Sequence, residues 1–347
     1  MRRKTALILV TTMMLLAILS GCGGAPDDAA SADSATSGGS EKSDPVSLTL
    51  VAYSTPREAY DAIIPAFRQT DAGKTIDVKT SFGASGDQSR AVQAGLPADI
   101  VAFSLEPDIS RLVKAGIVDA DWNQDPYQGR VTDSVVVLAV RPGNPKQIRT
   151  WDDLLKPGVE VITPNPFTSG GARWNVMAAY GAQLELGKSE VEAVEYLRAL
   201  FSHVSVQDKS ARESLQTFAG GKGDVLLAYE NEAIAAQHAG QQLDYVVPEQ
   251  TILIENPVAV TSNGKHPEQA KAFVDYLRSP EAQRIFGEKG YRPVAPDVLK
   301  EFTYPTPAKL FTIAKFGGWT EVTTKFFDPD TGIVAGIVRD QGVSRGR

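Results

Sequence analysis

The chain has 347 residues, of which 42% are hydrophobic, and its formal net charge is −7 at pH 7. A chain of this length can bury more than one hydrophobic core, and its acidic balance argues against nucleic acid as a partner, because phosphates bind clustered lysines and arginines. The single cysteine excludes an internal disulfide.

The first 21 residues are organised like a secretory signal. A basic tip at positions 2–4 precedes an apolar run from 6 to 19, which is too short to span a bilayer comfortably. The run ends in Leu-Ser-Gly-Cys at 19–22, which resembles the lipobox of bacterial lipoproteins, where cleavage precedes a cysteine that is then acylated. We therefore expect Cys22 to carry lipid that anchors the protein at the outer face of the cytoplasmic membrane.

Residues 22–45 predict a flexible tether. From position 23 the chain reads GGAPDDAASADSATSGGSEKSDP, which is rich in Gly, Ser, Ala and Asp and poor in large apolar side chains. Such a segment cannot bury enough surface to fold. The remaining chain is long enough for two domains.

Beyond the tether, short apolar runs rich in β-branched residues alternate with stretches of helical periodicity. The runs predicted as strands are 47–53, 75–82, 99–104, 134–140, 159–164, 224–230 and 244–248. The stretches predicted as helices lie near 57–69, 106–115, 171–186, 189–202, 210–219 and 267–278. This alternation predicts an α/β fold with mostly parallel sheets.

Three of the predicted strand-to-helix junctions are candidate sites for a small anion: GASGDQSRAV (83–92), TSGG (168–171) and KSARESLQTF (209–218). A helix N-terminus presents unpaired N–H groups and the positive end of the helix dipole. In the third junction, Ser210 and Glu213 have the spacing of a capping box, which leaves the N–H of Ala211 for a ligand. Each junction taken singly also fits an ordinary capped helix.

The order and separation of three motifs resemble those of the bacterial sulfate- and thiosulfate-binding proteins of ABC importers. The motifs are GASGDQSRAV, NPFTSGGARWN (165–175) and GDVLLAYENEA (223–233). The resemblance extends from about residue 48 to about residue 327, through SPEAQRIFGEKGYRP and KLFTIAKFGGW. NPFTSGGAR is its most specific piece, although the family usually has lysine where Phe167 stands.

The resemblance implies two α/β domains of the type II periplasmic-binding-protein fold, which close on a ligand held in the cleft between them. Domain one would comprise 46–132 plus 257–347, and domain two 133–256, with chain crossings near Val136 and Pro257. The implied function is capture of sulfate, or thiosulfate, by a monomer that delivers it to the membrane permease subunits of an ABC importer. The resemblance implies no cofactor, no metal and no catalysis.

The family binds its dianion almost wholly through neutral hydrogen-bond donors. The positions of this sequence that match the family's motifs imply the corresponding donors here. The implied donors are the backbone N–H groups of Ser54, Ser85, Gly170, Gly171 and Ala211, the hydroxyl of Ser169 and the side chain of Tyr229. Three further matches, Arg57, Arg173 and Arg212, are expected to brace the loops, and plain surface ion pairs are the alternative for them.

Two of these positions depart from the family. Ser54 stands where the family has aspartate, and Tyr229 stands where it has tryptophan. An indole N–H can only donate, whereas a phenol donates and accepts and places its polar atom differently. The Tyr229 hydroxyl therefore either contacts the anion or bonds elsewhere while its ring packs in the cleft.

The chemistry of the anion favours sulfate independently of the resemblance. Sulfate at neutral pH has no proton, so a site of donors suits it, whereas phosphate keeps a proton and needs an acceptor. Asp87 and Glu213 lie one turn inside their helices, and Ser54 is able to accept. Thiosulfate, molybdate or another tetrahedral oxyanion on the same fold is the alternative.

A lipid-anchored serine hydrolase is a remote alternative. Ser85 lies between a strand and a helix, but the motif G-x-S-x-G needs glycine at 87 and finds Asp87. The histidines, His203, His238 and His266, lack metal-ligand spacing and are expected on the surface.

Overall fold

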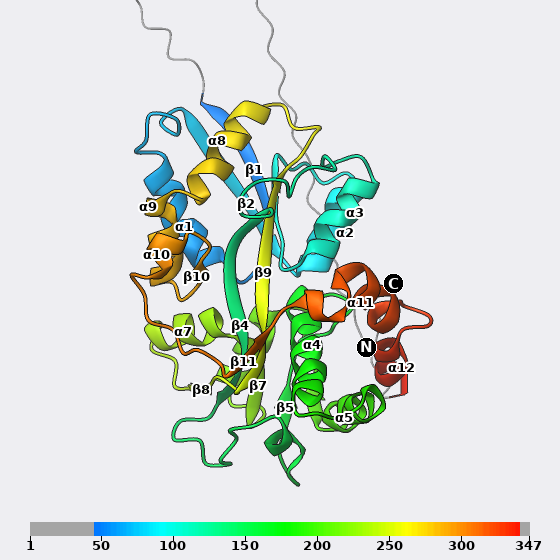
Figure 1. Ribbon diagram of the computed structural model, residues 1–347. Coiled ribbons are helices and arrows are strands. Elements are labelled where there is room, and N and C mark those ends of the chain that lie inside the picture. Colours follow the sequence, from blue (N-terminus) through cyan, green and yellow to red (C-terminus); the bar gives the residue numbers. More distant parts are fainter. Residues whose placement is uncertain (1–44, 341–347) are drawn as a thin grey trace, which may run out of the picture. The chain divides into compact units, whose positions relative to one another are not determined.

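Two long antiparallel strands, β4 (Arg130–Val140) and β9 (Gln250–Val260), form the centre of a computed structural model that describes residues 45–340 (Figure 1). The predicted signal segment, Cys22 and all of the predicted tether except residue 45 lie outside the described residues. Among residues 45–340, no helix has both the length and the apolar character needed to cross a membrane.

The strands join into one path in the order β2-β1-β3-β9-β4-β7-β5-β6. The flanking strands are β1 (Val46–Tyr53), β2 (Ile76–Gly83), β3 (Ile100–Ala102), β5 (Val161–Ile162), β6 (Val204–Val206) and β7 (Val225–Tyr229). Short strands β8 (Asp244–Val246) and β10 (Arg292–Pro293) pair with β4, and β11 (Lys309–Phe311) pairs with β9. The pairings within β1–β3 and within β5–β7 are parallel, but both central strands run antiparallel to their neighbours β3, β7 and each other. The α/β class is therefore confirmed, and the expectation of mostly parallel pairing is wrong.

The central strands pass from one group of elements to the other. β4 pairs with β9 up to Val135 and with β7 from Val136 onwards. β9 pairs with β4 as far as Pro257 and with β3 from Val258. We call the elements around β1–β3 the first lobe and those around β5–β8 the second lobe.

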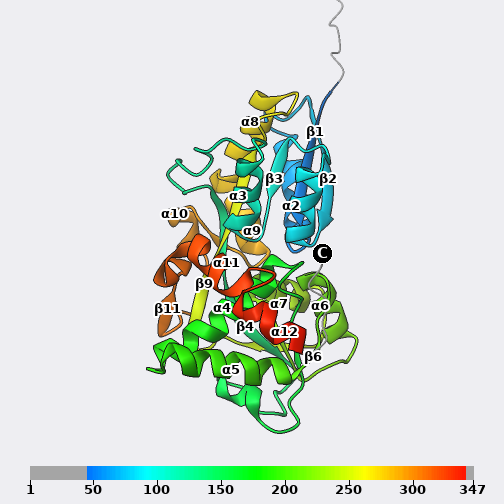
Figure 2. The same cartoon turned by 90° about the vertical axis from the view of Figure 1, so that its right-hand side faces the viewer.

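Helices cover the strands of each lobe (Figures 1 and 2). The first lobe has α1 (Arg57–Phe67), α2 (Ser85–Gln93), α3 (Glu106–Lys114), α8 (Pro267–Leu277), α9 (Pro280–Glu288) and α10 (Pro296–Leu299). The second lobe has η1 (Asp152–Leu155), α4 (Gly170–Glu185), α5 (Glu190–Ser202), α6 (Ala211–Ala219) and α7 (Glu230–His238). The chain ends with η2 (Ile313–Phe316), α11 (Gly318–Phe327) and α12 (Ile333–Asp340).

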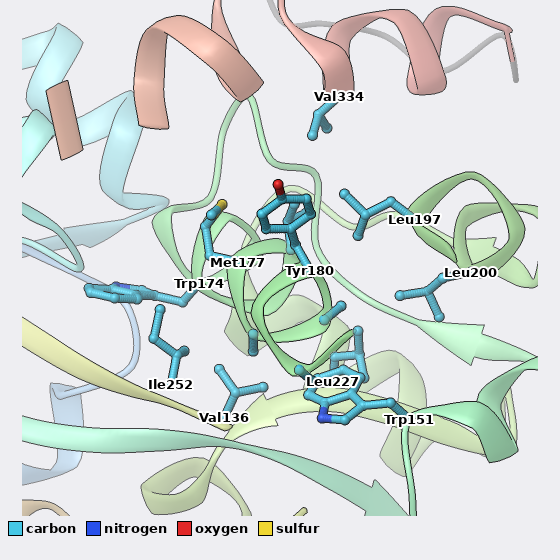
Figure 3. Close-up of a cluster of buried hydrophobic side chains, with 14 of the residues drawn as sticks. Val136, Trp151, Trp174, Met177, Tyr180, Leu197, Leu200, Leu227, Ile252 and Val334 are labelled. Atoms are coloured by element: carbon cyan, nitrogen blue, oxygen red, sulfur yellow. The ribbon is translucent and has the colours of Figure 1, made fainter. Parts of the chain in front are cut away.

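The largest hydrophobic cluster lies around α4, which is buried along most of its length (Figure 3). Trp174 and Tyr180 of α4 pack in it together with Val334 of α12. Trp174 also meets Trp319 of α11 edge to face, with ring centroids 4.7 Å apart. The apolar faces of α11 and α12 are thus buried on the second lobe.

This packing differs from the expected division of the chain, which assigned 257–347 wholly to domain one. Residues 309–340 pack with the second lobe, because β11 adds to β9 at Gln250 to Ile252 and the apolar faces of α11 and α12 join the cluster around α4. The division into two domains at 132 and 257 stays a prediction for the rest of the chain.

Candidate functional site

A small pocket between the lobes brings together the starts of α2, α4 and α6. Its wall consists of Tyr53, Ser54, Thr55, Ala84, Ser85, Ser104, Ser169, Gly170, Gly171, Ser210, Ala211 and Tyr229. Every residue that the sequence motifs propose as a ligand group therefore belongs to one pocket.

The start of α2 is anchored through the side chain of Ser85. Its hydroxyl donates to the Asp108 carboxylate at 2.6 Å and accepts from the Ser104 N–H at 3.0 Å. The next amide, Gly86 N–H, donates to the Thr168 carbonyl of the second lobe at 3.0 Å. Since Ser85 is the first helical residue, its own N–H has no acceptor within the helix and is available to a ligand.

The start of α4 is shaped by a serine followed by two glycines. Ser169 caps the helix by accepting from the Ala172 N–H at a long 3.4 Å, so its hydroxyl proton is still available. A Cβ added at Gly170 would lie 2.1 Å from Leu105 Cδ2, whereas one at Gly171 would meet nothing closer than 3.4 Å. Position 170 thus needs glycine because the first lobe approaches the helix start so closely.

The start of α6 contains the capping interaction predicted from Ser210 and Glu213 only in part. Ser210 accepts from the Glu213 N–H at 3.2 Å, as expected. The Glu213 carboxylate, however, accepts from the Lys209 N–H at 3.1 Å and not from Ser210. Ala211 is the first helical residue, so its N–H has no acceptor within the helix.

The strand ends supply the rest of the pocket wall. Ser54 is 8% exposed and follows β1, just ahead of the start of α1. Thr55 donates its hydroxyl to Glu232 of the second lobe at 3.2 Å. These residues place first-lobe backbone opposite the starts of α4 and α6.

Tyr229 lines the pocket but bonds to a neighbour. Its hydroxyl oxygen lies 2.6 Å from Ser104 Oγ, and burial raises the pKa of the phenol well above its usual range. The hydroxyl thus has a partner within the protein, and its contact with an anion stays a prediction. Two hydroxyls share one hydrogen bond here, so one of the two protons is left over for a ligand.

Sequence reasoning missed Ser104 and Asp108, which hold the start of α2. The signal for Ser104 is its place directly after the buried run of β3, where parallel strands of α/β folds present ligand groups. Asp108 has no comparable signal, because its role depends on a hydrogen bond to a residue 23 positions away.

None of the three arginines predicted to brace the loops lines this pocket. The Arg57 guanidinium is stacked over Phe82, 4.4 Å from the ring centroid. Arg173 donates from Nε to the Pro166 carbonyl at 2.9 Å, and burial lowers its pKa to about 10. Arg212 pairs with Glu58, with Nη1 to Oε2 at 3.0 Å.

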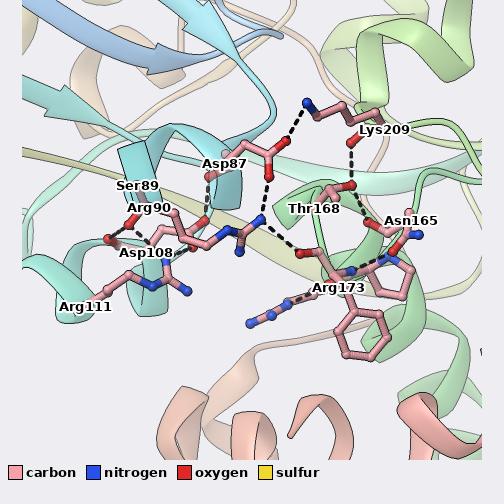
Figure 4. A network of polar contacts seen from close by, with 12 residues as sticks. Asp87, Ser89, Arg90, Asp108, Arg111, Asn165, Thr168, Arg173 and Lys209 are labelled. Atoms are coloured by element: carbon pink, nitrogen blue, oxygen red, sulfur yellow. Dashed lines mark hydrogen bonds and ion pairs between the residues drawn. The ribbon is translucent and has the colours of Figure 1, made fainter. Parts of the chain in front are cut away.

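The wall of the pocket, as the described residues form it, contains no carboxylate. Asp87, one turn inside α2, is paired with Arg90 at 2.5 Å and with Lys209 at 3.0 Å (Figure 4). Glu232 lies behind the wall, where it accepts from Thr55 and the Tyr229 N–H, and burial raises its pKa to about 7. The wall therefore offers amide and hydroxyl donors to an anion, with hydroxyl oxygens as its only side-chain acceptors.

The pocket has no arrangement for nucleophilic catalysis. The Ser85 hydroxyl is bonded to a carboxylate, and no histidine is among the described residues of the wall. Within residues 45–340 there is also no group of three or more His, Cys, Asp or Glu side chains arranged to hold a metal ion.

Comparison with known proteins matches residues 48–292 to the family of bacterial extracellular solute-binding proteins. A sulfate-binding protein of Synechococcus elongatus is 44% identical over 303 residues, which cover 84% of this chain and 86% of the relative. A thiosulfate-binding protein of Pseudomonas aeruginosa is 36% identical, with 81% of this chain and 89% of the relative covered. The solved structure of the sulfate-binding protein SubI from Mycobacterium tuberculosis is 48% identical and superposes with a TM-score of 0.80, covering 82% of this chain and 100% of that one.

Proposed function

The chain belongs to the bacterial extracellular solute-binding proteins, among the sulfate- and thiosulfate-binding members of that family, and from this premise we propose that its pocket captures sulfate for an ABC importer. The family consists of solute-binding proteins, so the chain is not an enzyme and the serine hydrolase alternative is discarded. The observation that carries the proposal is the convergence of three helix starts on one pocket whose described wall has no carboxylate.

The proposed donors act on the anion together. The N–H groups of Ser54, Ser85, Gly170, Gly171 and Ala211 are joined by the hydroxyl of Ser169 and by the one hydroxyl proton that the Ser104–Tyr229 hydrogen bond leaves over. Hydrogen bonds to a charged group contribute about 1.5–3 kcal/mol each, and each helix start adds the positive end of its dipole. Part of this energy is spent on ordering the lobes around the ligand.

Selectivity follows from the lack of a carboxylate acceptor. Sulfate accepts from every donor, whereas the proton of phosphate would face either another proton or a hydroxyl that must turn away from its present partner. A buried donor left without an acceptor costs about 1–3 kcal/mol, and several such mismatches multiply into strong discrimination. We expect phosphate to bind far more weakly than sulfate.

Thiosulfate is the second candidate ligand, and the thiosulfate-binding relative is the observation that favours it. Amide N–H groups donate to the oxygens of either dianion, and thiosulfate needs more room than sulfate because its sulfur–sulfur bond is longer than a sulfur–oxygen bond. We further propose that the protein acts as a monomer, that lipid on Cys22 holds it at the outer face of the cytoplasmic membrane, and that the permease subunits of the importer receive the anion from it.

Titration calorimetry of the protein with sulfate, thiosulfate, molybdate and phosphate tests the proposal. We expect sulfate to bind with a Kd in the micromolar range or tighter, which corresponds to a binding free energy of about −8 kcal/mol or a more negative value. Comparable affinities for sulfate and phosphate at pH 7 would overturn the assignment. Tighter binding of molybdate than of sulfate would indicate that molybdate is the ligand.

A further inference from the structure

The start of α6 is tied to the first lobe on both of its sides. Arg212, one residue after Ala211, pairs with Glu58 in the first turn of α1. Lys209, two residues before Ala211, pairs with Asp87 in the first turn of α2, with Nζ 3.0 Å from Oδ2. Two ion pairs that cross between the lobes thus flank one of the proposed donor amides.

The Lys209–Asp87 pair belongs to a wider set of contacts that link the three helix starts within and across the lobes (Figure 4). Gly86 N–H donates to the Thr168 carbonyl at 3.0 Å, and the Thr168 hydroxyl in turn donates to the Lys209 carbonyl at 2.7 Å. Arg90, which also pairs with Asp87, reaches the Phe167 carbonyl at 3.3 Å. All three helix starts that line the pocket are therefore joined by direct contacts.

We propose that the Lys209–Asp87 ion pair is a latch between the lobes that slows release of the bound anion. The inference rests on the proposed function, because it takes the pocket between the lobes as the anion site. Asp87 lies in α2 of the first lobe and Lys209 directly before α6 of the second, so the pair exists only while both helix starts face the same pocket. Loss of the pair raises the free energy of the closed state relative to the open one.

Lys209 has a second effect, which is to neutralise Asp87. Asp87 is two residues from Ser85 and also pairs with Arg90, so loss of Lys209 leaves its carboxylate less fully compensated and increases its repulsion of a dianion bound to the Ser85 amide. Removing the lysine therefore both opens the latch and leaves the Asp87 charge balanced by Arg90 alone, whereas removing the aspartate opens the latch without leaving a negative charge. For this reason, we expect substitution of Lys209 to speed release of the anion more than substitution of Asp87.

The exposure of the pair sets the expected magnitude. The Lys209 side chain is 63% exposed and the Asp87 side chain 29%, so solvent screens their attraction. Exposed ion pairs contribute about 0.2–1 kcal/mol, which corresponds to about a 1.4- to five-fold change in an equilibrium or rate constant. A change of this size in the dissociation rate of the anion is measurable.

The test measures the release of radiolabelled sulfate, chased by excess unlabelled sulfate, from the full-length protein and from Lys209→Met, Asp87→Asn and the double variant. We expect Asp87→Asn to speed release about two-fold and Lys209→Met up to about five-fold at low salt, with association rates changed less. The double variant should match Asp87→Asn, because the repelling carboxylate is gone as well. At high salt the differences should shrink, since ions screen the pair.

Lys74→Met is the matched control. Lys74 pairs with Asp71 at 3.0 Å, three residues away in the same lobe, and its side chain is also 63% exposed. Its loss should leave sulfate release unchanged. Unchanged release in Lys209→Met at low salt, or an effect equal to that of Lys74→Met, would overturn the latch.

Hydrogen exchange of the Gly86 amide gives a readout that needs no sulfate. This amide is bonded across the cleft to Thr168, so its protection reports closure of the lobes. The Gly86 amide hydrogen should exchange faster in Lys209→Met than in the parent protein, both with and without anion. Equal exchange in both proteins under all conditions would reject the latch, whereas failure of the parent to bind sulfate would reject only the proposed function.

Discussion

The hydroxyl oxygens of Ser104 and Tyr229 lie 2.6 Å apart and join the first lobe to the second in the wall of the pocket. Because of this hydrogen bond, we expect substitution of Ser104 and substitution of Tyr229 to affect anion binding to different extents. In Tyr229→Phe, the Ser104 hydroxyl loses its neighbour but is free to donate to the ligand. In Ser104→Ala, the buried phenol loses its partner, and its oxygen is held by the packed ring where it now lies.

We therefore expect Ser104→Ala to weaken sulfate binding by about 1–3 kcal/mol and Tyr229→Phe by less than about 1 kcal/mol. Calorimetry of both variants at pH 7 measures the difference, and thermal melting without ligand controls for stability. A larger loss in Tyr229→Phe would show instead that the phenol donates directly to the anion.

Ser169→Ala should weaken sulfate binding by about 1–3 kcal/mol, because it deletes one hydrogen bond to a charged ligand. The cap that it also removes is a weak one, at 3.4 Å from the Ala172 N–H, so the melting temperature without ligand should change little. Unaltered affinity in calorimetry would remove the Ser169 hydroxyl from the set of donors.

Gly170→Ala should impair closure of the lobes. The new Cβ would lie 2.1 Å from Leu105 Cδ2 and 2.6 Å from Ser104 Oγ, both in the first lobe, while the second lobe by itself is undisturbed. We expect at least a ten-fold loss of sulfate affinity, or about 1.4 kcal/mol, with little change in melting without ligand.

Gly171→Ala is the control for this substitution. Its new Cβ would meet Ala211 Cβ and Tyr229 Cε1 at 3.4 Å, which are ordinary contacts. Equal losses of affinity in the two variants would argue against the close approach at Gly170 as the cause.

The stability of the ligand-free protein should fall as the pH rises towards neutrality. Burial raises the pKa of Asp133 to about 7, and that of Glu232 also to about 7, from unfolded values near 4. A carboxyl group with a raised folded pKa binds its proton more tightly in the folded state, so its stabilisation is complete below the unfolded pKa and is lost as the pH rises through about 7.

Asp133→Asn tests this dependence away from the pocket. In the parent, Asp133 accepts from Arg130 at 3.0 Å and faces Glu255 on the neighbouring strand. Between pH 5 and 7.5, the free energy of unfolding should fall less steeply in the variant than in the parent. The two slopes should differ by up to about 1.4 kcal/mol per pH unit, which is the contribution of this one group. Urea unfolding at several pH values measures the slope, and an identical slope in parent and variant would contradict the prediction.

The sequence predicted the elements that depend on local signals. The helix starts at Ser85, Gly170 and Ala211 follow from small or capping residues placed after apolar runs. The observed α4 and α6 begin within one residue of the predicted bounds, whereas the prediction for the junction at 83–92 gives no helix bounds. The strand predictions omit β9, because Glu255-Asn256-Pro257 interrupts its apolar pattern, and the helix predictions omit α11 and α12.

The sequence by itself thus determined which residues form the three donor-bearing helix starts, since capping and backbone freedom are decided within a few positions of the chain. Only the tertiary structure decided what holds those starts together. The partners Ser104 and Tyr229 are 125 positions apart, so no local pattern connects them. The same holds for the Lys209–Asp87 pair and for the burial of α11 and α12 on the second lobe, because each depends on how the lobes pack and not on the preferences of neighbouring residues.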